Sequence, residues 1–537
     1  MTPTDSGIAI RGLRGRKQLV VDGRPYLVLG AELHNSSGSS RSAIEAGLDR
    51  AKAMNANTAL VPVSWELIEP REGEFDFSLV DTLLETTRER SLRLIPLWFG
   101  SWKNGQSSYV PRWVKANPTR FPRALLSDGT AIEHLSPFGD EACESDAAAF
   151  SAFMSHLAAH DADERTVLMV QVENEVGLLG DSRDRSELAD RAFDAAAPAS
   201  LFELLATGVE LSMRPQWEAR GRPTAGSWRN AFGADPRTDE AFMAWGYARY
   251  VERVAAAGKD RFDVPVFTNT WLDSEIDIPG AMLAGGQRPG TYPSGGPVIS
   301  VAPIWRSFAP SLSFVSPDIY VGDFDAICGH YASANDGALF IPEMRRDDVG
   351  AGQLFLAIGR HAALGASPFG VDSGDAHELD AFADAFALAS AAAPLLAAAH
   401  ADDICGFHLN VDTAEAMVEV GSQRFTANLS RASADPAAAR GGYGLVIRTE
   451  DDEFIAIGRG FQLMPVSDGG SPVGILEVDE LQATSTGLMP GRRLNGDETM
   501  AGAAWVHPAR GHAAPGVLPI AAEGQSSGIS RCRLYRF

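Results

Sequence analysis

The chain has 537 residues, of which 45% are hydrophobic and 22% charged, and its formal net charge is −24. This length predicts two domains or one large barrel with an appendage, because a single core seldom grows so large. The acidic charge, the lack of a dense lysine and arginine run, and the lack of an apolar run of roughly eighteen residues argue against nucleic acid and membrane as partners.

The predicted elements begin with a hairpin and a buried strand. Lys17–Val21 and Pro25–Leu33 are apolar runs, and the Asp22-Gly23 pair between them is a strong signal for a tight turn. Ser42, with Glu45 three residues later, is typical of a capping box, so we expect the first helix to begin there.

Further strands follow, and each is separated from the next by an apolar helical segment. They are predicted at Thr58–Val63, Leu92–Phe99, Val167–Val172, Val264–Thr270, Leu312–Tyr320, Ala338–Met344 and Ala366–Val371. Eight strand–helix units in series predict an α/β fold of the TIM-barrel type, (β/α)8. A doubly wound open sheet shows the same alternation, but it normally opens with a glycine-rich phosphate turn, and none follows the first strand.

After about Ala401 the pattern changes to short apolar runs separated by Gly, Asp, Asn and Pro. Such runs are typical of an antiparallel, sandwich-like β domain. We therefore expect two domains. A catalytic barrel with an N-terminal hairpin covers residues 1–400, and a smaller antiparallel β domain covers residues 401–537.

Two glutamates stand directly after apolar strands. In MVQVENEVG, at Met169–Gly177, the apolar pattern breaks into Glu173, Asn174 and Glu175, and Glu343 follows ALFIP in the same way. Carboxylates are seldom buried unless they are paired or used, and the carboxyl ends of barrel strands are where chemistry takes place. An acidic helix N-terminus or a charged loop would look similar, but we favour a functional pair.

The fourth and seventh strands lie nearly opposite each other in a ring of eight, so Glu175 and Glu343 are expected to face each other across the barrel mouth. Carboxyl groups about 5–5.5 Å apart serve a retaining glycosidase, one as nucleophile and one as a general acid that later acts as base. At that distance each charge raises the pKa of the other carboxyl group, so one of them stays protonated.

Other chemistries find less support. No HExxH or other histidine-rich zinc pattern and no GxSxG motif is present, so we expect neither a metal nor a cofactor, although carboxylates alone could hold Mg²⁺. The four cysteines lie far apart and are expected to be free thiols. The first residues, MTPTDSGIAIRGLRGRK, lack an apolar core, so we expect no signal peptide and a cytoplasmic location, or a periplasmic one if the chain is trimmed.

Aromatic and polar residues near the predicted strand ends indicate a sugar ligand, because an indole stacks on a sugar face while fixed polar groups bind its hydroxyls. The side chains expected to contact the sugar are Glu32, His34, Trp65, Trp102, Lys103, Asn104 and Trp271. For Trp102, in a Gly/Ser/Asn-rich stretch, we favour the pocket over core packing.

Three motifs occur in order: GAELHNS at Gly30–Ser36, VSWELIEPREGEFDF at Val63–Phe77 and QVENEVG at Gln171–Gly177. Together with Glu343 they resemble the motifs of glycoside hydrolase family 35, the β-galactosidases, over roughly residues 20–375. The resemblance implies a retaining exo-β-galactosidase that forms a covalent galactosyl-enzyme. The roles that it implies are Glu175 as acid/base, Glu343 as nucleophile, Asn174 as the ligand of the sugar 2-hydroxyl and Tyr320 as a hydrogen-bond donor to the nucleophile.

The chain departs from the family pattern in two places. Ser101–Asn104 replaces the usual alanine–glutamate pair after the third strand, and Pro342 and Met344 flank Glu343. With one β domain, the chain looks like a compact bacterial branch. Its expected ligand is a small or oligomeric β-galactoside, and a homo-oligomer is allowed. Another retaining exo-β-glycosidase, such as a β-glucosidase, and a non-catalytic carbohydrate-binding barrel remain alternatives.

Overall fold

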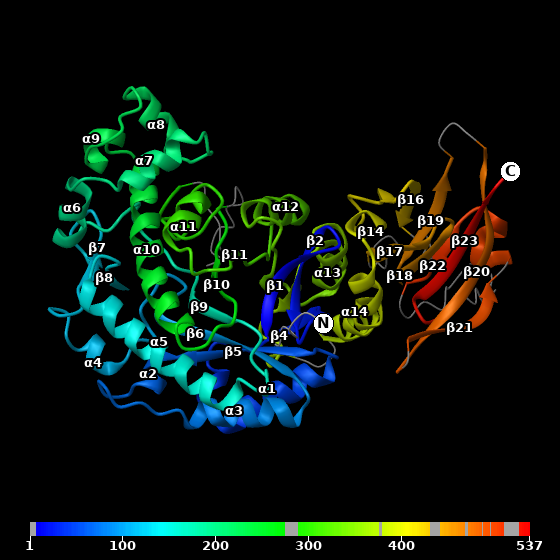
Figure 1. Cartoon of the computed structure of the whole chain (residues 1–537), viewed down its shortest axis with the longest axis horizontal. Helices are drawn as coiled ribbons and strands as arrows, with labels where there is room; N and C mark the ends of the chain where they lie inside the picture. Colours follow the sequence, from blue (N-terminus) through cyan, green and yellow to red (C-terminus); the bar gives the residue numbers. More distant parts are fainter. Residues whose placement is uncertain are drawn as a thin grey trace, which may run out of the picture.

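The structure is a computed structural model, and it shows a barrel followed by antiparallel sheets (Figure 1). The residues that it describes are 7–273, 288–374, 379–429, 441–467, 471–485, 487–494, 496–509 and 526–537. In Figure 1 the barrel and its helices lie to the left, and the strands of the last part of the chain lie to the right.

The chain begins with a three-stranded antiparallel sheet, formed by β1 (Ile8–Leu13), β2 (Arg16–Val21) and β3 (Arg24–Tyr26). Asp22 and Gly23 connect β2 to β3, with φ angles of 52° and 74°. Two successive left-handed residues are what a type I′ hairpin turn requires, and Asp-Gly suits it. The predicted hairpin is confirmed, and β1 is an additional strand that pairs with β2.

Eight parallel strands form the barrel. They are β4 (Val28–Glu32), β5 (Thr58–Ser64), β6 (Arg93–Lys103), β9 (Val170–Asn174), β10 (Val266–Thr270), β11 (Phe314–Pro317), β12 (Ile341–Met344) and β13 (Gly365–Pro368). Their order in the sheet is β11-β10-β9-β6-β5-β4-β13-β12. A parallel bridge between Ile319 and Met344 joins the two remaining edges, so the ring is nearly closed. The predicted (β/α)8 fold is confirmed.

Helices surround the strands and supply the crossovers. The longer ones are α1 (Arg41–Ala53), α3 (Ser78–Glu89), α5 (Asp140–Asp161), α10 (Pro236–Lys259), α12 (Phe324–Ala334), α13 (Asp348–Arg360) and α14 (Asp380–Ala398). The shorter ones are α2 (Trp65–Ile68), α4 (Arg112–Lys115), α6 (Glu187–Asp194), α7 (Ala199–Ala206), α8 (Arg214–Ala219), α9 (Trp228–Phe232) and α11 (Ala302–Phe308). A small hairpin of β7 (Arg123–Leu125) and β8 (Ala131–Leu135) precedes α5, and α6 to α9 lie at the upper left of Figure 1.

The start of the first helix differs from the prediction. Ser40, not Ser42, is the N-cap of α1, and its hydroxyl accepts a hydrogen bond from the Ala43 amide at 3.3 Å. Ser42 and Glu45 have the spacing of a capping box, but the chain is already helical at Arg41. A run of serines offers several possible caps, and the backbone uses the one that is still extended.

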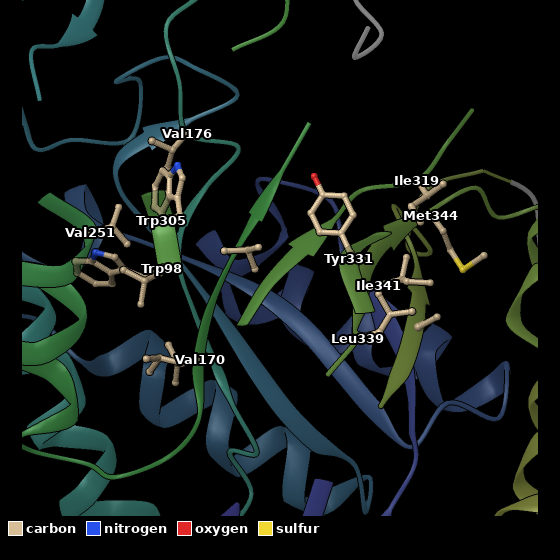
Figure 2. Packing of buried hydrophobic residues seen from close by; sticks show 14 of the residues in the cluster. Trp98, Val170, Val176, Val251, Trp305, Ile319, Tyr331, Leu339, Ile341 and Met344 are labelled. Carbon is tan, nitrogen blue, oxygen red and sulfur yellow. The ribbon is translucent and has the colours of Figure 1, made fainter. Parts of the chain in front are cut away.

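The barrel strands are buried on both faces, as expected for a parallel sheet covered by helices. In β6, Ile95, Leu97 and Phe99 belong to the cluster inside the barrel, whereas Leu94 and Trp98 belong to the cluster between strands and helices. Figure 2 shows side chains of the outer cluster. Leu19 and Val21 of β2 join the inner cluster, so the N-terminal hairpin closes one end of the barrel.

Two antiparallel sheets follow the barrel. The six-stranded sheet has the order β14-β17-β18-β23-β20-β21 and the four-stranded sheet the order β15-β16-β19-β22. The strands are β14 (Ile404–Leu409), β15 (Glu415–Val420), β16 (Gln423–Leu429), β17 (Gly442–Glu450), β18 (Glu453–Arg459), β19 (Phe461–Val466), β20 (Val473–Thr484), β21 (Gly487–Leu494), β22 (Trp505–His507) and β23 (Ile529–Arg536). The predicted antiparallel class is confirmed, while the domain boundary near residue 400 stays a prediction.

The six-stranded sheet has two apolar faces. Leu445 and Ile447 of β17 belong to the cluster that includes the barrel helices, whereas Val446 belongs to the cluster with the four-stranded sheet. This alternation follows from the two-residue period of a strand. A Cβ atom on Gly406 of β14 would lie 2.1 Å from the carbonyl oxygen of Phe355 in α13, so only glycine permits this close approach.

Among the described residues, α14 is the one helix whose length and composition would allow it to cross a membrane. Several of its apolar side chains, including Phe382, Phe386 and Leu396, are buried in the main core cluster. All four cysteines are free, as predicted.

Candidate active site

Glu175 and Glu343 meet at the carboxyl ends of β9 and β12. Their side chains are only 2% and 5% exposed. The two carboxylates and that of Asp318 each offer an oxygen that lies within 4.8 Å of the others. The structure therefore brings the two predicted glutamates together and adds a third buried carboxyl group.

Lys103 supplies positive charge to this group of acids. Its Nζ atom donates a hydrogen bond to Asn174 Oδ1 at 2.8 Å, and it lies 3.8 Å from Glu175 Oε2 and 3.9 Å from Glu343 Oε1. Burial alone would lower the pKa of Lys103, but the nearby carboxylates, Glu343 first, outweigh burial and hold it above its ordinary value. The ammonium group is therefore charged and offsets part of the buried negative charge.

Glu343 accepts hydrogen bonds at both carboxylate oxygens. Asn174 Nδ2 and Asn269 Nδ2 donate to Oε1 at 3.2 and 3.3 Å, and the Tyr320 hydroxyl donates to Oε2 at 2.8 Å. These donors come from β9, from β10 and from the segment after β11. They fix the orientation of the carboxylate and stabilise its charge.

Glu175 has a different environment. Burial, followed by the charge of Glu343, raises the pKa of Glu175 to about 8, although Lys103 acts in the opposite direction. Its backbone amide donates to Asn269 Oδ1 at 3.0 Å, and among the described residues its Oε2 atom has no hydrogen-bond partner. The side chain also forms hydrogen bonds with Asp318 and Trp271. At neutral pH the group therefore carries a proton.

Asn269 and Asp318 also belong to the site, although neither is among the residues predicted from the sequence. The Asn269 amide donates to Asp318 Oδ2 at 2.7 Å. Burial, then the charges of Glu343 and Glu175, raise the pKa of Asp318 well above its usual range. The predicted strand Leu312–Tyr320 includes Asp318, whereas β11 ends at Pro317, so Asp318 is the first residue after the strand.

Glu32 also contributes to the electrostatics of the site. It ends β4 and is 1% exposed. Burial raises the pKa of Glu32 well above its ordinary value, and the charge of Glu343 raises it further. Trp271 follows β10 and is partly exposed, and its side-chain hydrogen bond lowers the pKa of Glu175. Both predicted residues are thus close enough to influence the central carboxyl groups.

Two predicted sugar-stacking residues pack in the core instead. Trp102 is fully buried, its ring lies edge-on 4.5 Å from that of Tyr250, and its Nε1 donates to the carbonyl oxygen of Leu135 at 3.1 Å. β6 continues through Lys103, so Trp102 lies on a strand and not in the expected loop. Trp65 is also fully buried, with its Nε1 bonded to Glu69 Oε2 at 2.8 Å.

Two further predicted residues show no contact with the central carboxyl groups within the described part of the chain. Asn104 and Gly105 have φ angles of 51° and 63° and form the tight turn between the paired Lys103 and Gln106. Asn-Gly suits that conformation, so the turn alone accounts for Asn104. His34 is exposed, and its ring lies 5.4 Å from that of Phe369.

The carboxylates of Glu175, Asp318 and Glu343 are close enough to one another to chelate a divalent cation. Lys103 argues against that use, because its ammonium already lies within 4 Å of two of them. A cation placed among these oxygens would be repelled at short range. The arrangement suits two carboxyl groups of different protonation that share one ligand.

Part of the chain is similar to glycoside hydrolases. Residues 38–205 match a family model described as Beta-galactosidase, that of glycoside hydrolase family 42, and residues 382–505 match a domain of unknown function, DUF5597. A β-galactosidase of Xanthomonas manihotis is 28% identical over 185 residues, which is 32% of this chain and 27% of that protein. The predicted resemblance to β-galactosidases is thus supported over part of the chain, but the matching family model is that of family 42 and not that of family 35.

Two solved structures are similar at low identity. The β-galactosidase of Marinomonas ef1 has a TM-score of 0.47 and 14% identity, over 69% of this chain and 61% of that chain. The catalytic domain of a Paenibacillus polymyxa β-amylase has a TM-score of 0.48 and 14% identity, over 66% of this chain and 96% of that chain.

Proposed function

We propose that this chain is a retaining exo-β-galactosidase, with Glu343 as nucleophile and Glu175 as acid/base. The observation that carries the proposal is the distance between the two carboxylates, whose nearest oxygens lie within 4.8 Å at the carboxyl ends of β9 and β12, three places apart in the ring of strands. Retaining enzymes place these groups about 5–5.5 Å apart, whereas inverting enzymes leave roughly 6.5–9.5 Å for a water molecule.

In the first step, a carboxylate oxygen of Glu343 attacks the anomeric carbon of a terminal β-linked galactose. As that bond forms, the bond to the leaving oxygen breaks, and the proton of Glu175 passes to the leaving oxygen. Tyr320 donates a hydrogen bond of 2.8 Å to one oxygen of Glu343, and Asn174 and Asn269 donate hydrogen bonds to the other oxygen. These donors hold the nucleophile in one orientation before the substrate arrives.

In the second step, Glu175 takes a proton from water, the water oxygen bonds to the anomeric carbon, and the bond to Glu343 breaks. The change of role follows from the electrostatics. The charge of Glu343 raises the pKa of Glu175, and that charge disappears while Glu343 is esterified. Glu175 is therefore protonated and acts as an acid before glycosylation, stays ionised afterwards and can accept a proton from water, and ends the cycle protonated.

Asn174 is suited to bind the sugar 2-hydroxyl, as the resemblance to family 35 implies. Its amide is oriented by Lys103 on one side and by Glu343 on the other, at 2.8 and 3.2 Å. The amide is therefore fixed beside the anomeric centre, where a bond to the 2-hydroxyl strengthens as the ring gains positive charge. The finer assignment to family 35 rests on this resemblance and stays a prediction.

The test is a panel of nitrophenyl glycosides, with the anomer released first identified by NMR. We expect the β-galactoside to be the best substrate and the first product to be the β-anomer. Glu343→Gln should lose several orders of magnitude in kcat, whereas the surface control Glu164→Gln should not. An inverted product, or near-normal turnover by Glu343→Gln, would refute the mechanism.

The same panel separates the alternatives. Faster hydrolysis of a β-glucoside would keep the mechanism and replace galactose by glucose. Saturable sugar binding without hydrolysis of any glycoside would instead identify a binding barrel, in which the protonated Glu175 has no catalytic use.

A further inference from the structure

Two carboxyl groups that the proposed mechanism does not use lie behind the site. Asp146 of α5 and Glu173 of β9 are both 0% exposed, and a hydrogen bond joins their side chains. Burial raises the pKa of both groups, and the charge of Asp146 raises that of Glu173 further. Two adjacent buried carboxyl groups cannot both ionise, so the pair shares one proton.

The remaining partners of this pair come from one short stretch of β6. Asp146 accepts from Trp98 Nε1 at 2.9 Å, from the Ser101 amide at 3.0 Å and from the Ser101 hydroxyl at 2.7 Å. Glu173 accepts from the Ser101 amide at 3.2 Å and from the Trp102 amide at 2.7 Å. The two carboxyl groups therefore bind main-chain amides, which a barrel strand normally bonds to its neighbouring strand.

The register of β6 explains why those amides are available. Trp98 pairs with Val172, but the next pair is Lys103 with Asn174, so the four residues of β6 between these pairs lie opposite one residue of β9, Glu173. The intervening residues form a bulge, and the Asp146–Glu173 pair supplies the acceptors that the β9 backbone does not. A Cβ atom on Gly100 would lie 2.7 Å from oxygens of both carboxyl groups, so the bulge leaves room for no side chain there.

We propose that Asp146 and Glu173 position Lys103 for the reaction by holding this bulge in place. Lys103 is the residue at which the bulge ends, and its Nζ atom reaches Asn174 Oδ1 at 2.8 Å. Asn174 follows Glu173 directly in the chain. The pair thus fixes both partners of the Lys103–Asn174 hydrogen bond from behind, and this role rests on the proposed function.

Loss of the pair would leave buried amides of the bulge without acceptors. An unpaired buried amide is costly, so the bulge would shift to find other partners, and Lys103 would move with it. The Lys103 charge lowers the pKa of Glu175. Its displacement should therefore raise that pKa and move the alkaline limb of kcat/KM to higher pH.

The test compares Glu173→Ala with Glu173→Gln. We expect Glu173→Ala to lose roughly a hundredfold in kcat, with the alkaline limb moved upward. Glu173→Gln should recover most of the loss, because its amide can donate to Asp146 while its oxygen accepts from Trp102. Leu157→Ala, a buried change on α5, is the control for lost stability and should leave the limb in place.

A second measurement needs no activity. Hydrogen exchange of a peptide that covers residues 98–103 should quicken in Glu173→Ala but not in Leu157→Ala. If the wild-type protein hydrolyses no glycoside, the proposed function fails, while exchange still tests the bulge. The positioning role is overturned if the wild-type protein is active but Glu173→Ala and Leu157→Ala have the same alkaline limb of kcat/KM and the same hydrogen-exchange rate over residues 98–103.

An independent observation concerns the outer surface of the barrel. Asp81 of α3 and the pair His156 and His160 of α5 each offer a ligand atom within 4.8 Å of the others. Residues four apart lie on one face of a helix. His156 Nε2 lies 2.7 Å from Asp81 Oδ1, and the ring of Phe77 stacks on His156 at 4.3 Å. Two imidazoles and a carboxylate thus converge from two helices.

We infer that these three side chains bind a divalent transition metal such as Zn²⁺, with water in the open position. Imidazole and carboxylate are suitable ligands for this class of metal, and the metal would displace the proton between His156 and Asp81. Because the ligands come from α3 and α5, the bound ion would tie these two helices together and stabilise the folded chain.

Isothermal titration calorimetry with ZnCl₂ measures how many zinc ions bind, and thermal unfolding with and without ZnCl₂ measures the gain in stability. We expect the wild-type protein to bind one more zinc ion than His160→Ala and to gain more thermal stability from it. His400→Ala is the matched control, since His400 is also an exposed histidine and lies 3.6 Å from Asp402. Equal zinc stoichiometry and affinity in the wild-type protein and His160→Ala would overturn the inference.

Discussion

The Lys103 ammonium group donates to the amide oxygen of Asn174 at 2.8 Å, across the carboxyl ends of two neighbouring barrel strands. The same nitrogen lies within 4 Å of both Glu175 and Glu343. One cation therefore orients the expected sugar-binding amide and adjusts the charge of both proposed catalytic groups.

Lys103→Met should remove that charge while it keeps most of the side-chain volume. The pKa of Glu175 should rise, because Lys103 lowers it in the wild-type protein, and the alkaline limb of kcat/KM should move to higher pH. Stability should fall by about 3–5 kcal/mol, since buried carboxylates lose their counter-charge. Rate–pH profiles and urea unfolding measure the two effects, and an unmoved alkaline limb would contradict the electrostatic role.

Tyr320→Phe removes one donor to Glu343, the 2.8 Å hydrogen bond at Oε2. A hydrogen bond to a charged group contributes about 1.5–3 kcal/mol, so kcat for a nitrophenyl β-galactoside should fall roughly ten- to a hundredfold. Tyr535→Phe, on a tyrosine that is 43% exposed, should leave kcat unchanged. Equal rates for both variants would mean that the hydroxyl of Tyr320 does not assist the nucleophile.

Protonation of Glu175 should make stability depend on pH. Its pKa of about 8 in the folded chain exceeds the ordinary value of 4.5, so the folded state binds the proton more tightly. The contribution to stability is fully present below pH 4.5 and is lost as the pH rises through about 8. Glu175→Gln should therefore lose less stability than the wild-type protein between those values, as thermal unfolding over that range would show. A parallel fall in both proteins would contradict the raised pKa.

The two tryptophans near the site should respond differently to substitution. Trp102→Ala should destabilise the fold by about 3–5 kcal/mol, because Trp102 is fully buried, and should leave KM nearly unchanged in the protein that remains folded. Trp271→Ala should raise KM with little loss of stability, since this partly exposed residue follows β10 beside Glu175. Denaturant unfolding and steady-state kinetics test both predictions. A raised KM with little loss of stability in Trp102→Ala would mean that Trp102 contacts the sugar.

The barrel could be predicted from sequence because its strands are short apolar runs, and the Asp22-Gly23 pair fixes the first turn within the chain itself. Glu175 and Glu343 could be selected because each stands at or just past the end of such a run. These signals are local, so a single sequence contains them.

The parts that could not be predicted depend on contacts between distant residues. β6 extends to Lys103 because Asp146 and Glu173 accept hydrogen bonds from its bulge, and nothing near Trp102 in the sequence indicates those acceptors. Asp318 was hidden because an apolar pattern shows where a strand can run, not where its pairing stops. In the structure β11 ends at Pro317, and Asp318 therefore lies at the carboxyl end of the strand, beside the other acids.

The close approach of β14 to α13, at Gly406 and Phe355, has a consequence for any attempt to shorten this protein. α13 follows directly after the strand that presents Glu343, and its outer side is covered by the sheet that a cut near residue 400 would discard. A chain that ended there would expose the apolar side chains of α13 to solvent. It would therefore aggregate instead of folding into a smaller enzyme. The β sheets after residue 400 could therefore be lost or replaced in evolution only together with changes in the outer surface of α13, the helix that follows the strand of Glu343.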